Sequence, residues 1–131
     1  MNSPVTPGTS YLNEPTWSRS EKAVARKVFD AALKRELQQV IQEAKQMANQ
    51  IKEPADLSAL ERYLTQRRKD IDRKYEFRSS RLTRVFGTLL WERRIREEEL
   101  RGLGEDKIKA IRSCAKVWSD NAATALVSGA A

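Results

Sequence analysis

The sequence predicts an all-α fold: a long antiparallel helical hairpin plus a small C-terminal helical head, with two copies forming a homodimer. The 131 residues include 33% charged and 40% hydrophobic side chains but only five glycines and four prolines, a composition typical of long amphipathic helices. Two or three long helices enclose little core in so short a chain. An elongated helical protein of this size therefore often completes its core by pairing with a second copy.

The stretch from Glu53 to Leu90 carries the second observation that predicts this fold. Apolar residues recur there at steps of three, four or seven, the spacing of one face of a helix with about 3.6 residues per turn. A single helix cannot bury such a face alone, so it needs a partner from the same chain or from another. The residues of this face are Leu57, Leu60, Leu64, Ile71, Tyr75, Leu82, Val85 and Leu89.

A first helix is predicted from Arg19 to Glu53, a span without glycine or proline. Ser18 and Glu21 have the spacing of a capping box, in which each side chain accepts a backbone N–H of the other residue. Apolar residues, Val40 and Met47 among them, fall on one broad face. At 1.5 Å per residue the helix would be about 50 Å long, which is too long to fold over a core of its own chain.

Pro54 separates this helix from the next, because proline ends a helix that precedes it and suits the first turn of one that follows. The connection is short, so a second helix that begins near Asp56 should run back antiparallel against the first.

The head is expected after Ser79-Ser80, two poor helix formers that predict a bend. Gly87 lies in the apolar segment that follows and indicates either the close approach of another helix or a tolerated defect. The predicted organisation is a flexible arm at 1–16, one helical domain at 17–119 and a frayed tail at 120–131. Within the domain, the hairpin spans 17–78 and the head spans 79–119.

An enzyme is not expected. Histidine is absent and Cys114 is the single cysteine, which removes the commonest general base, the commonest zinc ligand and any intrachain disulfide. The sequence has no phosphate-binding glycine loop, and no cofactor is expected. No apolar run approaches the roughly 20 residues that span a bilayer, and the first residues do not resemble a secretory signal, so a cytoplasmic protein is expected.

The net charge of +7 and the pI near 9.8 favour acidic partners, although such charge is also common on a solvated surface. Residues 62–84 hold nine basic and three acidic side chains. An alternative function is therefore a basic helical module that binds nucleic acid or an anionic surface. The interleaved acids, and the lack of helix-turn-helix spacing or a stacking set of aromatics, argue against nucleic acid. A scaffold without a ligand is a third possibility.

An ordered pattern of residues extends over about residues 16–112. Its most specific part is the segment RRKDIDRKYEFR at 67–78. The other elements of the pattern are Trp17-Ser18, Phe29, Arg35-Glu36-Leu37, Asp56-Leu57, Val85-Phe86, Leu89-Leu90, Glu99-Leu100 and the run from Asp106 to Ile111. This pattern resembles the fluorescence recovery protein family.

The resemblance implies a non-enzymatic regulator that pairs through its long helices. Family members bind the photoactivated orange carotenoid protein, chiefly its C-terminal domain, and speed its return from the active red to the resting orange state. The expected partners are thus a second copy of the chain and an orange carotenoid protein or a related two-domain switch; no membrane partner is expected. Leu57 occupies a leucine position of the family's dimer contact, and the expected dimer interface contains Val40, Met47, Leu57 and Leu64.

The expected partner-binding residues depart from the family pattern. Ser58 stands where the family usually has a tryptophan, and Glu61-Arg62 replaces a His-Asp pair. The tryptophan and the aspartate are tied to binding the carotenoid protein, while the family's arginine six residues later is retained as Arg68. Losing an aromatic anchor and reversing a charge should weaken the affinity or change the partner.

Overall fold

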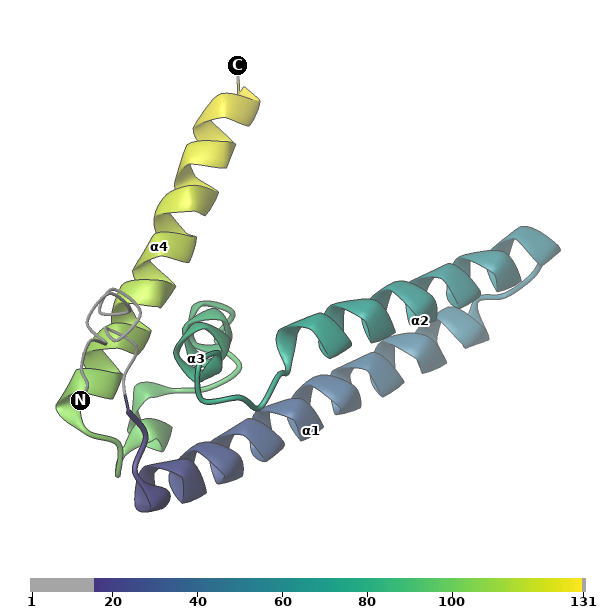
Figure 1. Cartoon of the computed structure of the whole chain (residues 1–131). Coiled ribbons are helices and arrows are strands. Elements are labelled where there is room, and N and C mark those ends of the chain that lie inside the picture. The colour runs from purple at the N-terminus through teal and green to yellow at the C-terminus, as the bar shows by residue number, and fades with distance from the viewer. Residues whose placement is uncertain (1–15, 131) are drawn as a thin grey trace, which may run out of the picture.

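The computed structural model describes residues 16–130, with side chains described to residue 124. Figure 1 shows a long helical hairpin and a head from which the last helix projects. No β-strand occurs among the described residues, so the all-α prediction is confirmed. The elements are α1 Arg19–Asn49, α2 Pro54–Lys74, α3 Leu82–Trp91, the short 3-10 helix η2 Glu97–Leu100, and α4 Glu105–Ala130.

The hairpin forms as its local signals predict. The Ser18 hydroxyl accepts the backbone N–H of Glu21 at 3.1 Å, and the Glu21 carboxylate accepts the N–H of Ser18 at 3.0 Å. Helix α1 ends at Asn49, before the expected Glu53, and α2 begins at Pro54, slightly before the expected Asp56. The Asp56 carboxylate caps this second start by accepting the N–H groups of Lys52 and Glu53. Helices α1 and α2 lie side by side and antiparallel (Figure 1).

The hydrophobic core lies at the head and not along the hairpin. The N-terminal half of α1 packs against α3, η2 and α4, so the expectation that the first helix is too long to fold over a core of its own chain is wrong for this half. Only one end of a long helix needs to meet the head for a core to form there. The buried residues are Trp17, Ala25, Val28, Phe29, Ala32, Leu82, Val85, Phe86, Leu89, Ile95, Leu100, Leu103 and Ile111.

Gly87 lies where two helices approach closely, which is one of the two interpretations that the sequence allowed. A Cβ placed on Gly87 of α3 would lie 2.4 Å from the Cβ of Cys114 of α4, well inside van der Waals contact. Helices α3 and α4 can therefore pack this closely only because position 87 has no side chain.

The chain ends differ from the predicted organisation in one respect. Helix α4 continues to Ala130, whereas a frayed tail was expected from residue 120. Alanine has the highest helix propensity of all residues, which favours a helical backbone in this alanine-rich segment. The expected arm lies almost wholly at 1–15, outside the described residues. None of the helices in the described part is long and apolar enough to cross a bilayer.

Candidate functional site

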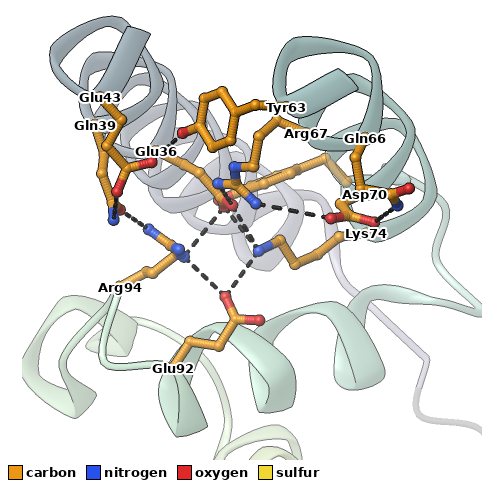
Figure 2. Close-up of polar contacts among 11 residues, drawn as sticks. Glu36, Gln39, Glu43, Tyr63, Gln66, Arg67, Asp70, Lys74, Glu92 and Arg94 are labelled. Carbon is orange, nitrogen blue, oxygen red and sulfur yellow. Dashed lines mark hydrogen bonds and ion pairs between the residues drawn. The ribbon is translucent and has the colours of Figure 1, made fainter. Parts of the chain in front are cut away.

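A buried carboxylate joins the hairpin to the head. Glu36 of α1 is fully buried, and Figure 2 shows side chains converging on it from three directions. Arg67 and Lys74 of α2 lie 2.7 and 2.8 Å from its oxygens, and the Tyr75 hydroxyl donates to it at 2.8 Å. Arg94, from the segment after α3, lies 3.2 Å away. One carboxylate thereby holds two helices and the head in a fixed relation.

The Glu36 carboxylate stays ionised because hydrogen bonds from its neighbours lower its pKa by more than burial raises it. Desolvation raises the pKa of this carboxyl, but hydrogen bonds from Lys74, Arg67 and Tyr75 lower it further, so the net pKa lies below the usual range. The same geometry raises the pKa of the Tyr75 hydroxyl, through burial and then through its bond to Glu36. Glu92 closes the cluster by accepting from both Lys74 and Arg94, at 2.7 and 2.8 Å.

The end of α3 explains how Arg94 reaches this cluster. Arg93 adopts a positive φ of 62°, and the N–H groups of Arg93 and Arg94 bond back to the carbonyls of Leu90 and Leu89. This is the Schellman arrangement that ends many helices and reverses the chain. The reversal turns the segment after α3 toward α1, where Arg94 also donates to Gln39 at 2.8 Å (Figure 2).

A second buried carboxylate ties the start of α1 to the start of α4. Besides capping its own helix, Glu21 accepts the N–H of Gly104 at 2.7 Å and pairs with Lys107 at 3.0 Å. The bond from Ser18, and then those from Gly104 and Lys107, hold the pKa of Glu21 at about 2 despite its burial. The Glu21 side chain thus links the N-terminal end of α1 to the N-terminal end of α4.

The far half of the hairpin keeps its apolar face exposed in the single chain. Leu57 and Leu64 of α2 are 59% and 41% exposed, and Leu37 and Ile41 of α1 are exposed to a similar extent. Val40 and Met47 of α1 are half-buried. The spacing of seven places Leu57 and Leu64 on one face of α2. Four large aliphatic side chains of the hairpin are therefore exposed to solvent in the single chain.

The four residues expected to bind the partner are all exposed on α2, but they lie on two faces. Ser58 and Arg62 are four residues apart and share one face. Glu61 and Arg68 alternate with Leu57 and Leu64 along the other face. The structure therefore brings Glu61 and Arg68 to the edge of the apolar surface and separates Ser58 and Arg62 from it.

Sequence reasoning missed the role of the Glu36 cluster. Glu36 was noted only as part of a family pattern, although it follows Ala25, Phe29 and Ala32 on the buried side of α1. A carboxylate on an otherwise apolar face was the available signal, because a charge in such a position requires partners. No cluster of three metal-ligating side chains occurs in the described part of the chain.

These features define an all-α protein with a core at one end and an exposed hairpin at the other. Sequence comparison then gives the family. The model of a family described as "Photoprotection regulator fluorescence recovery protein" matches residues 17–115. The chain belongs to the fluorescence recovery protein family, and its class is that of a photoprotection regulator.

Individual relatives agree with this assignment. The fluorescence recovery protein of Synechocystis sp. is 36% identical over 104 residues, which cover 79% of this chain and 95% of the relative. The solved structure of the Fremyella diplosiphon protein has a TM-score of 0.74 at 37% identity, covering 77% of this chain and 99% of its own. The structure of the Synechocystis protein has the same TM-score at 36% identity and the same coverage of both chains.

Proposed function

We propose that this chain is a non-enzymatic, dimeric, cytoplasmic regulator that binds an orange-carotenoid-protein-like photoreceptor through the C-terminal domain of that photoreceptor. Binding speeds the return of the photoreceptor from the active red state to the resting orange state. The physical basis is differential affinity: a regulator that binds one conformer, or the transition between conformers, more tightly shifts the population or the rate.

The observation that carries the proposal is the family match over residues 17–115, which includes both hairpin helices and most of the head. The exposed positions of Ser58, Glu61, Arg62 and Arg68 support α2 as the partner-binding element. The replaced side chains at 58, 61 and 62 lead us to expect lower activity than in relatives that carry the aromatic and acidic residues.

Ion pairs argue against the alternative function, a basic module that binds nucleic acid, because they occupy cations that phosphates would need. Four of the nine cations at 62–84 already bind carboxylates: Arg67, Lys74, Arg78 and Arg81. If Arg62, Arg67, Arg68 and Arg73 did contact duplex DNA, affinity would fall log-linearly with salt. We expect only unspecific binding that disappears near physiological ionic strength. Sequence-selective binding at that salt would favour the alternative.

The decisive experiment follows the decay of red-state absorbance of an orange carotenoid protein after illumination. The wild-type chain should hasten the decay, and Ser58→Trp with Arg62→Asp should hasten it further, because the pair restores an apolar anchor and the sign of the charge. Ala23→Trp with Lys27→Asp is the matched control, since both residues are exposed on α1 with the same spacing. Should neither wild type nor the restored variant speed the decay, the partner is a different protein.

A further inference from the structure

A charged cleft lies where the hairpin meets the head, and it goes beyond the proposed function. Its volume is about 420 Å³, and its walls come from the C-terminal end of α2, from α3, from the segment after α3 and from α4. This volume is in the range of about 300–1,000 Å³ that is typical of small-molecule sites. The cleft shares Arg67, Lys74, Glu92 and Arg94 with the Glu36 cluster drawn in Figure 2, so a fixed set of ion pairs shapes one of its walls.

Two cations of the cleft are left without a carboxylate. Six basic side chains line it, and four of these bind acids of the cleft or Glu36. Arg73 and Arg84 line the same cleft and form no ion pair with any residue that the structure describes. Guanidinium groups are the side chains best suited to bidentate contacts with phosphate.

One wall of the cleft is an aromatic ring held in place from two sides. Trp118 stacks on Trp91, with ring centroids 5.6 Å apart and an interplanar angle of 20°. Its Nε1 donates to the Thr88 hydroxyl at 2.9 Å. The indole is still 41% exposed, and it lies beyond residue 115, where the family match ends. A fixed, exposed ring next to unpaired arginines provides a surface for a flat base.

We propose that this cleft binds a nucleotide, with its phosphates against Arg73 and Arg84 and its base against Trp118. An acidic peptide would satisfy the arginines but leave the indole without a flat partner. Duplex DNA would need cations along an outer surface and not within a cleft of this size. A mononucleotide matches the volume, the charge and the ring together.

The test is calorimetric titration of ATP, without magnesium and at low ionic strength, into the full chain. Wild type should bind about one ATP per chain, and Arg73→Gln with Arg84→Gln should weaken binding by about tenfold or more, because charge-assisted contacts are lost. Lys22→Gln with Lys27→Gln removes the same charge from exposed positions of α1 outside the cleft and should leave the affinity unchanged. Equal weakening by both double variants would overturn the proposal.

The aromatic contact is tested separately, with pyrophosphate as a second probe. Trp118→Leu should weaken ATP but leave pyrophosphate unchanged, whereas Trp118→Phe, which keeps a ring, should retain most of the ATP affinity. Circular dichroism of each variant checks that the helices persist. An ATP affinity indifferent to Trp118→Leu would exclude nucleotide recognition. Duplex DNA or an acidic peptide would also exclude it if its binding needs both Arg73 and Arg84 and is not displaced by ATP. Absence of ATP binding in the millimolar range overturns the proposal outright, and none of these outcomes bears on the photoreceptor assay.

Discussion

Glu36 is the residue on which the joint between hairpin and head depends. Removing one partner of a buried ion cluster leaves uncompensated charges, a change that typically costs about 3–5 kcal/mol. Glu36→Gln leaves Arg67, Lys74 and Arg94 without their shared anion, so we expect the free energy of unfolding to fall by about 3 kcal/mol. Urea denaturation measures this change. Tyr75→Phe is the comparison, because it removes one neutral donor to the carboxylate and should cost less, about 2 kcal/mol.

Glu21 gives the fold a dependence on acid that has a defined sign. Its pKa is about 2 in the folded chain against an ordinary 4.5. Since the folded pKa is the lower one, the stabilisation is complete above the ordinary value and is lost as pH falls from 4.5 towards 2. We expect Glu21→Gln to lower the free energy of unfolding by about 2 kcal/mol near neutral pH, and the difference from wild type to shrink through this window.

Thermal or urea unfolding at several pH values measures the effect of Glu21. Glu98→Gln is the control, since this carboxylate of η2 is exposed and forms no ion pair within the described residues. A gap between wild type and Glu21→Gln that stays constant down to about pH 2 would contradict the assignment of the charge to this carboxylate.

At the scale of elements, the contact between α3 and α4 depends on a missing side chain. Gly87→Ala would place a methyl group 2.4 Å from the Cβ of Cys114, so the helices must separate. Overpacking costs about 1–3 kcal/mol, and the better helix propensity of alanine returns about 1 kcal/mol. We expect a net loss of up to about 2 kcal/mol in urea denaturation. Cys114→Gly in the same chain should recover part of it, and purely additive effects of the two changes would refute direct contact.

The elements themselves could be predicted from sequence more fully than their packing. The capping box of Ser18 and Glu21, and Pro54 at the start of α2, mark helix starts through backbone hydrogen bonds that involve only nearby residues. The core was harder to predict, because Ala25, Phe29 and Ala32 pack on segments that lie more than forty residues away in sequence. Periodicity gives the buried face of a helix but not its partner.

Only the local features of the candidate site could be predicted from sequence, because its tertiary contacts join segments that are far apart in the chain. The exposure of Ser58 and Arg62 follows from their position on α2, whereas the contact of Arg94 with Glu36 depends on the chain reversal at Arg93. A positive φ at a non-glycine residue leaves little signal in sequence. The roles of the partner-binding and dimer residues stay predictions.

At the scale of the whole molecule, the hydrophobic core lies at the head, and the hairpin leaves apolar side chains exposed. The hairpin extends well beyond the head (Figure 1), and in α2 only Ile71, close to the head, is a buried hydrophobic residue. Farther out, the Tyr63 hydroxyl of α2 donates a hydrogen bond to Glu43 of α1. An exposed apolar face on a slender hairpin is what a second copy of the chain would cover.

Leu57→Glu tests this pairing. Leu57 is 59% exposed in the single chain, so a charge there should leave the folded protomer intact, while in a dimer seam the same charge must be desolvated. We expect light scattering to give a dimer for wild type and a monomer for Leu57→Glu at tens of micromolar, with unchanged helical circular dichroism. Thr65→Glu, which adds the same charge at another exposed position of α2, should remain dimeric. A wild-type chain that is monomeric at this concentration would show that the exposed face serves another partner, because an obligate dimer of this kind does not dissociate there.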